Sequence, residues 1–197
     1  MFLIFFFAIF TFVAAENALR IPQLGVPPLE PLAVSEINID TGVGPVTITQ
    51  NYRNIKIYGL TDSILTSYKA DLKHFRLRTD SLTPKMEFLA DYVMKGRILV
   101  LPIQGKGIAN ITMVDLVVKH DLIGEPVVRD GVTYMHMKDY KIKFIPKKVS
   151  LQFLNENSEL VFNELKDSYE KSLSSVFQDV TNKIFDKVPM NQIFVEE

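Results

Sequence analysis

The stretch from Asn157 to Lys187 contains neither glycine nor proline, and it constrains the fold more than any other part of the chain. Its apolar residues recur at steps of three or four, as on one face of an α-helix: Val161, Leu165, Tyr169, Leu173, Val176, Val180 and Ile184. Either Asn155 or Asn157 can cap the start of this helix, and Pro189 is expected to end it. A helix of this length spans ~46 Å at ~1.5 Å per residue. It therefore needs a long apolar groove.

Upstream of this helix, the sequence alternates between apolar and polar residues, which is typical of half-buried antiparallel strands. The Asp130-Gly131 pair predicts a tight turn. Because no helical segment separates the strands, they favour an antiparallel sheet over βαβ units. The predicted fold class is therefore α+β, with a strongly curved antiparallel sheet wrapped around the long C-terminal helix. The segments that carry the alternation are 37–40, 46–49, 55–58, 75–78, 97–101, 107–119 and 132–144.

The amino terminus resembles a secretory signal. Phe2–Val13 is almost entirely apolar, and the small residues Val13-Ala14-Ala15 follow it as a cleavage site. The alternative is a membrane anchor, but a spanning helix needs ~20 apolar residues and this run is shorter. We therefore expect residues 1–15 to be a signal peptide and 16–197 to be one secreted, extracellular domain with no stable membrane insertion.

The composition excludes several classes of function. Lys plus Arg total 22 and Asp plus Glu total 23, so the net charge of −1 gives no reason to expect nucleic acid as a partner. The chain has no Cys and three His without metal-ligand spacing, and it carries neither a GxSxG nor a P-loop motif. We therefore expect no metal, no cofactor and no enzymatic activity. The two GxG fragments, 42–44 and 105–107, are expected to form turns or bulges.

Several segments, taken together and in order, resemble the insect takeout and haemolymph juvenile-hormone-binding family. The carrying segments cover nearly all of the chain that follows residue 15: Leu24-Gly25-Val26-Pro27-Pro28-Leu29-Glu30-Pro31-Leu32, Gly44-Pro45-Val46, 51–60, 71–73, 90–92, 96–107, 154–157, 162–166 and 184–189. Two features of the family pattern are missing. One is the N-terminal region with a Cys pair, and the other is a loop between the last strand and the "LNEN" motif.

The resemblance implies that the sheet and helix enclose an apolar tunnel. It also implies a carrier that binds juvenile hormone, a related terpenoid or a fatty acid, with a link to circadian or feeding regulation. A protein receptor, if there is one, cannot be named from the sequence. Two alternatives stay open: a secreted signalling or interaction protein whose core is filled by its own side chains, and a lipid esterase.

The wall of such a tunnel would be apolar, with one or two polar groups to hold the head of the ligand. Tyr134 and Tyr169 carry hydroxyls that suit this role. The alternative for each candidate is plain core packing. A separate expectation is glycosylation of Asn110, which begins an Asn-Ile-Thr sequon. The expected wall residues are Leu165, Tyr169, Leu173, Val176 and Val180 from the helix and Phe75, Leu77, Ile98, Val100, Tyr134 and Phe144 from the strands.

Overall fold

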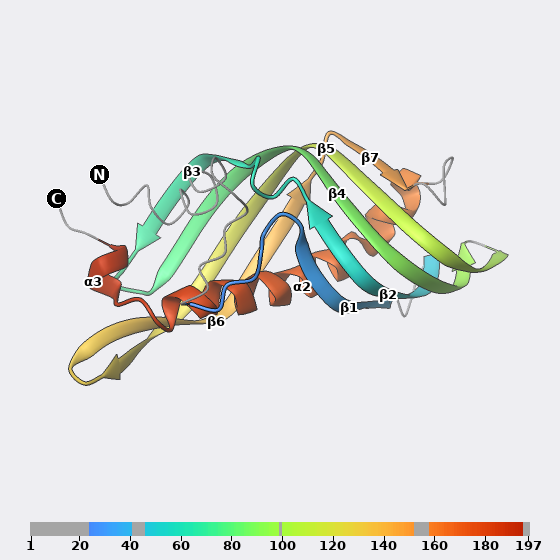
Figure 1. The fold of residues 1–197 in the computed structure, drawn as a ribbon. Helices are drawn as coiled ribbons and strands as arrows, with labels where there is room; N and C mark the ends of the chain where they lie inside the picture. Colours follow the sequence, from blue (N-terminus) through green and yellow to red (C-terminus); the bar gives the residue numbers. More distant parts are fainter. Residues whose placement is uncertain (1–23, 41–45, 99, 152–157, 195–197) are drawn as a thin grey trace.

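The computed structural model describes residues 24–40, 46–98, 100–151 and 158–194. In this part of the chain, one antiparallel sheet arches over a long helix (Figure 1). The predicted α+β fold is therefore confirmed. The strands are β1 (Leu32–Asp40), β2 (Val46–Tyr58), β3 (Ile64–Asp71), β4 (Arg76–Ile98), β5 (Leu101–Arg129), β6 (Val132–Ile145) and β7 (Lys148–Leu151), and the helices are α2 (Ser158–Phe185) and α3 (Met190–Ile193).

The two longest strands, β4 and β5, form the spine of the sheet. The whole of β4 lies beside residues 101–123 of β5, from Arg76 opposite Ile123 to Ile98 opposite Leu101. The other edge of β4 pairs first with β3 and then with β2, and the other edge of β5 pairs first with β7 and then with β6. Because each long strand changes partner along its length, the sheet can curl into the arch seen in Figure 1.

Two sequence predictions about the strands were wrong. The run 97–101 is not one strand, since β4 ends at Ile98 and β5 begins at Leu101. Gly105 and Gly107 are not at a turn or bulge, because they lie within β5 and pair in register with β4. A Cβ atom at Gly105 would lie 3.4 Å from the hydroxyl oxygen of Tyr92, and a Cβ atom at Gly107 would lie 3.4 Å from its ring. Glycine at both positions therefore leaves room for the Tyr92 side chain. The other GxG fragment, 42–44, lies outside the described residues.

Two further strand predictions were incomplete. The segments 46–49 and 55–58 form one strand, β2, whose register with β4 shifts between Arg53 and Lys56. Asn54 lies within that shift and has a φ of 53°, as expected at a bulge. The Asp130-Gly131 turn is confirmed, because both residues have positive φ and they join β5 to β6.

The long C-terminal helix is confirmed as α2. Its backbone hydrogen bonding continues past Phe185, since the N–H of Val188 donates to Ile184 O at 2.8 Å. Pro189 follows directly and precedes α3, so the proline stops the helical hydrogen bonding as expected. The two candidate N-cap residues, Asn155 and Asn157, lie outside the described residues.

Polar side chains of α2 bind the edge of β6 that none of the described strands pairs with. They occur every four residues and so share one face of the helix, beside the apolar face. An unpaired strand edge is otherwise a site of aggregation, and here the helix covers it. The bonds are Phe144 N–H to Glu170 Oε1 (2.7 Å), Ile142 N–H to Ser174 Oγ (3.1 Å), Met137 N–H to Asn182 Oδ1 (2.8 Å), and Gln178 Nε2 and Asn182 Nδ2 to Met137 O (3.0 and 2.9 Å).

The helix also contacts β1, the opposite edge strand of the sheet. Its apolar face therefore closes the arch from below, and the main core lies between that face and the concave side of the sheet. Val161 and Leu165 of α2 are completely buried there, as is Tyr52 of β2. A second, smaller cluster joins Leu77 and Phe185 to α3 at the carboxyl end of α2.

Two predictions about processing concern the ends and surface of the fold. The expected signal peptide, residues 1–15, lies outside the described residues. Within the part that the structure describes, no helix is long and apolar enough to cross a membrane. Asn110 is half-buried in β5 between the buried residues Ala109 and Ile111, so its side chain lies on the convex side of the sheet, away from the core.

Candidate functional site

One cavity lies between α2 and the concave face of the sheet. It measures about 50 Å³, which is room for a few water molecules. Its wall is mostly apolar, and polar side chains of β4, β5 and α2 interrupt it. The lining residues are Leu60, Ser63, Tyr68, Leu77, Thr79, Ser81, Thr83, Met86, Val118, His120, Leu122, Tyr140, Phe144, Phe177 and Thr181.

A second cavity of about 10 Å³ continues the first one toward the amino-terminal half of α2. Met86 lines both cavities, so they lie next to each other at this flexible side chain. The first cavity meets the helix at Phe177 and Thr181, and the second meets it at positions about one to four turns earlier. The two cavities therefore follow the helix axis as one interrupted passage. The second is lined by Met86, Phe88, Ile111, Met113, Phe162, Tyr169 and Leu173.

A buried polar cluster lies beside the second cavity. The hydroxyls of Tyr52 and Tyr169 are 2.8 Å apart, and they lie 2.8 and 2.7 Å from Gln50 Oε1. The Gln50 amide nitrogen in turn donates to Met94 Sδ at 3.4 Å. Burial raises the pKa of both tyrosines above its ordinary value, so both hydroxyls stay protonated. Their hydrogen bonds join α2 to β2, which makes this cluster a structural link rather than a free ligand-binding group.

A second polar cluster lies in the wall of the first cavity. His120 lies between Tyr140, whose hydroxyl is 2.9 Å from Nδ1, and Ser81, whose hydroxyl is 3.3 Å from Nε2. Ser63 and Thr83 form a separate pair, with 2.6 Å between their hydroxyl oxygens. The cavity therefore combines an apolar wall with neutral hydrogen-bonding groups, which is the usual composition of a site for a small apolar ligand.

The burial of His120 predicts a dependence of stability on pH. Burial lowers the pKa of His120 from 6.5 to about 4, so the folded protein holds a neutral imidazole where the unfolded chain would bind a proton. Stability is therefore full above pH ~6.5 and falls as the pH drops from there toward ~4. Between pH 7.5 and 5.5, we expect a loss of about 1 kcal/mol in the free energy of unfolding, measured by urea denaturation. The His120→Gln variant should lose this part of the pH dependence, and an unchanged slope in the variant would contradict the assignment.

The structure brings most of the predicted wall residues of α2 to the cavities or the core beside them. Tyr169 and Leu173 line the second cavity, and Leu165 and Val180 are buried in the same core. Val176 is partly buried and packs against that core.

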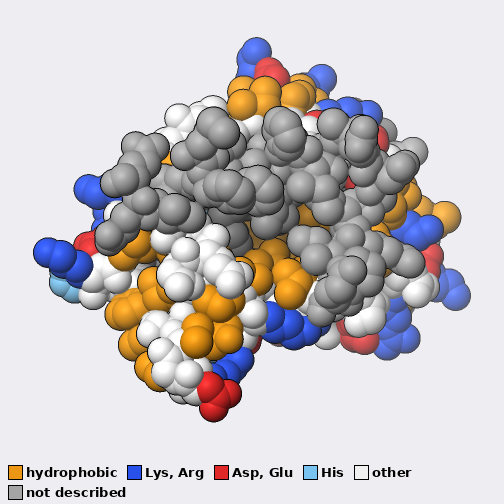
Figure 2. Space-filling model, turned by 60° about the vertical axis from the view of Figure 1, so that its left-hand side comes forward, with side chains coloured by type: hydrophobic (Ala, Val, Ile, Leu, Met, Phe, Trp, Pro, Cys, Tyr) orange, Lys and Arg blue, Asp and Glu red, His pale blue; other side chains and the backbone are white. Residues whose placement is uncertain are grey.

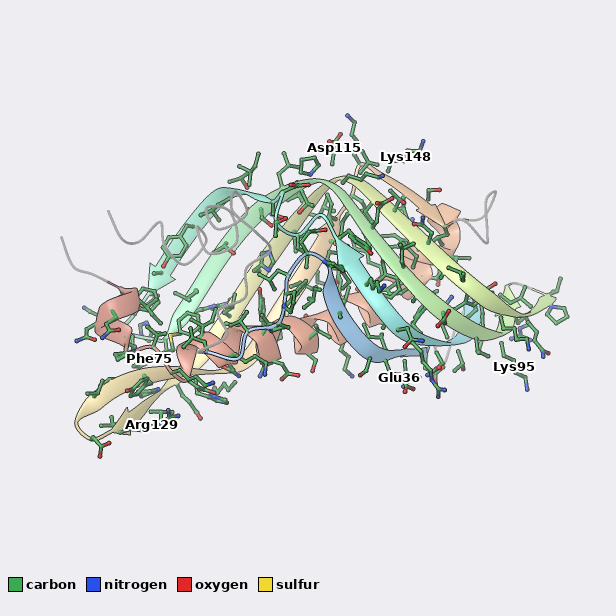
Figure 3. All side chains as sticks on the ribbon, in the orientation of Figure 1. Glu36, Phe75, Lys95, Asp115, Arg129 and Lys148 are labelled. Atoms are coloured by element: carbon green, nitrogen blue, oxygen red, sulfur yellow. The ribbon has the colours of Figure 1, made fainter. Side chains whose placement is uncertain are left out.

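The predicted strand residues divide into two groups. Leu77 and Phe144 line the first cavity. Phe75 lies at the end of the molecule that carries the β5–β6 hairpin, partly buried against the smaller cluster (Figure 3). Tyr134 lies in that hairpin beneath the guanidinium of Arg129, at 5.0 Å from the ring centre, and lines neither cavity.

The other two predicted residues lie at the opposite end of the molecule, where β4 and β5 meet. Val100 is 86% exposed and lines neither described cavity, because the turn that holds it extends beyond the helix and faces solvent. The side chain of Ile98 lies outside the described residues. Lys95 marks this end of the molecule in Figure 3.

The polar part of the cavity wall was not predicted from the sequence. Thr79, Ser81 and Thr83 alternate along β4 and are all buried. The charged residues Arg78 and Asp80 occupy the alternate positions, and this contrast between neutral and charged polar residues is the signal that identifies the inner face. Among the residues that the structure describes, no group of His, Asp or Glu side chains has the geometry of a metal site.

Comparisons with known proteins agree with this geometry. Residues 18–153 and 147–195 match the model of a family described as haemolymph juvenile hormone binding protein (JHBP). The circadian clock-controlled protein daywake of Drosophila yakuba is 26% identical over 202 residues, covering 90% of this chain and 78% of that protein. The daywake protein of Drosophila melanogaster is 29% identical over 186 residues, covering 90% of this chain and 69% of that protein.

The fold also matches a solved structure. The crystal structure of Epiphyas postvittana Takeout 1 superposes with a TM-score of 0.76 at 21% identity, covering 88% of this chain and 87% of that one. The curved sheet and the long helix therefore occur together in both molecules. The family match spans almost the whole described chain, and it confirms the resemblance found in the motifs. The chain belongs to the haemolymph juvenile hormone binding protein family.

Proposed function

We propose that this protein is a secreted carrier that binds a small apolar ligand, such as juvenile hormone, a related terpenoid or a fatty acid, between α2 and the concave face of the sheet. The observation that carries the proposal is the pair of apolar-walled cavities aligned along the helix, in a chain of a family described as hormone-binding. The proposed role is sequestration and not catalysis.

The driving force for binding is the removal of apolar surface from water. Each Å² of apolar surface that leaves water contributes ~25 cal/mol. The wall residues Leu77, Leu122 and Phe177 supply the apolar contacts, and the neutral polar groups of β4 and β5 fix the orientation of the ligand.

The cavities are narrow, so binding requires side chains to move. About 50 Å³ is less than a terpenoid or fatty acyl chain occupies. Met86 and Met113 are unbranched side chains that repack easily, and Met86 lies in the wall of both cavities. Displacing these side chains would join the cavities into one passage along α2.

The narrow cavities also support a second candidate function. A secreted signalling or interaction protein would keep its core filled by its own side chains and bind no lipid. The small volume of both cavities favours this alternative, whereas the alignment of the cavities and their polar wall groups favour the carrier.

Native mass spectrometry of the secreted protein distinguishes the two functions. The full chain would be expressed in insect cells, purified from the medium, and extracted with organic solvent after the intact mass is measured. The carrier predicts a stoichiometric lipid in the extract and a matching mass shift. A folded protein without lipid, which also takes up no added terpenoid ester or fatty acid, would support the filled-core alternative.

The same sample tests the proposed processing. We propose that cleavage follows Ala15, so the mature protein begins at Glu16, and that Asn110 carries a glycan on the convex side of the sheet. Amino-terminal sequencing checks the first proposal, and a mass loss on treatment with an N-glycosidase checks the second.

The two daywake relatives are described as clock-controlled, and we propose a similar link here. A time series of transcript levels over the day would test this link.

A further inference from the structure

The strand β4 presents a row of neutral hydroxyl groups to the first cavity. Thr79, Ser81 and Thr83 occupy alternate positions and are 4%, 3% and 2% exposed. All three line the cavity. Two of them already have side-chain partners, since Ser81 lies 3.3 Å from His120 Nε2 and Thr83 pairs with Ser63.

Thr79 differs from the other two because its hydroxyl has no hydrogen-bond partner among the residues that the structure describes. Buried hydroxyl groups without a partner are unfavourable and uncommon in folded proteins. The Thr79 Oγ atom lies in the wall of a cavity whose other contacts are mostly apolar. An oxygen atom of a bound ligand would supply the missing partner.

The charge of the cavity wall limits which ligand can supply that oxygen. Among the residues that the structure describes, none that lines the cavity is Lys, Arg, Asp or Glu. The titratable wall residues are His120, Tyr68 and Tyr140, and burial holds all three in the neutral form at neutral pH. A carboxylate placed here would lose its hydration without gaining a counter-charge, whereas a neutral carbonyl or ether oxygen loses little.

We propose that Thr79 donates a hydrogen bond to a neutral oxygen of the ligand, such as the carbonyl of an ester, and that the cavity thereby selects esters over the corresponding free acids. This inference rests on the proposed carrier function and identifies its ligand class and head-group site. Hydrophobic side chains gather on the end of the molecule that Figure 2 turns forward, with Lys and Arg side chains at the margins of that face.

The test compares two ligands that share one chain. Isothermal titration calorimetry at pH 7.4 would measure binding of methyl farnesoate and of farnesoic acid, which is ionised at this pH, to the delipidated full-length secreted protein. We expect the ester to bind about tenfold more tightly than the acid. In Thr79→Val, which keeps the shape and removes the hydroxyl, the affinity for the ester should fall about fivefold while that for the acid changes little.

Two further variants separate a loss of the hydroxyl from a structural effect. Thr79→Ser keeps a hydroxyl and should keep the preference for the ester. Thr133→Val makes the same chemical change at an exposed position of β6 and should bind both ligands as the unmodified protein does. Equal affinities for ester and acid, or a Thr79→Val variant that binds the ester normally, would overturn this inference and leave the carrier function intact. Binding of neither ligand would overturn this inference as well, and it would also exclude terpenoids as the ligands of the proposed carrier.

Discussion

Replacing Leu165 by alanine should lower the free energy of unfolding by about 2–5 kcal/mol, which is a large part of the stability of a typical domain. Leu165 has no exposed surface and lies on the apolar face of α2, where it packs against the concave side of the sheet. Truncation removes buried methyl groups and leaves a cavity that the neighbouring β-strands cannot fill by moving. Urea denaturation followed by circular dichroism measures the change.

The adjacent residue provides the control for this prediction. Glu164 is exposed on the same turn of α2, and Glu164→Ala should change the free energy of unfolding by less than about 0.5 kcal/mol. If Leu165→Ala were as mild as Glu164→Ala, the helix would not be held by its apolar face.

Replacing Met86 by tryptophan should abolish lipid binding, with a loss of affinity of about a hundredfold or more. Met86 is 3% exposed and lines both cavities, so a larger and stiffer side chain at this position would block the passage between them. A hundredfold loss corresponds to ~2.7 kcal/mol. Displacement of a fluorescent fatty acid analogue measures the affinity, and a melting curve establishes that the variant is folded, since overpacking costs ~1–3 kcal/mol.

Two variants test the assignment of Met86. Val93→Trp adds the same ring to the same strand, but Val93 is 57% exposed on the convex side of the sheet, so binding should not change. Met86→Ala removes the barrier and should preserve or increase the affinity for long chains. Normal binding by Met86→Trp would mean that the ligand lies elsewhere.

The helix and the strand class were predictable from the sequence because each has its own period of hydrophobicity. The apolar residues from Val161 to Ile184 recur at helical spacing, and α2 covers them as predicted. The long β4–β5 hairpin was not found, because the apolar run at 97–101 has the composition of a strand and contains no turn residue. The turn there is imposed by the pairing of the two long strands, which is a non-local interaction.

The apolar part of the candidate site was predictable, but its polar part was not. Leu77 and Phe144 could be selected because they alternate with charged residues. Thr79 and Ser81 were not selected, since polar residues on a strand are usually on the exposed face. The same holds for Glu170 and Asn182, which bind the edge of β6 from within an amphipathic helix. A pattern of hydrophobicity cannot separate a buried polar group that has a partner from a solvated one.

Photoaffinity labelling tests most directly whether an apolar ligand binds between α2 and the sheet. A fatty acid ester with a diazirine in its chain would be bound to the secreted protein and irradiated, and the tryptic peptides would be sequenced by mass spectrometry. We predict labels on the β4 peptide 86–95, which contains Met86, and on the α2 peptide 172–183, which contains Phe177, and an excess of unlabelled ester should remove them. Labels confined to the peptide 98–106, which carries the exposed Val100, or labels that the unlabelled ester does not displace, would contradict the internal site.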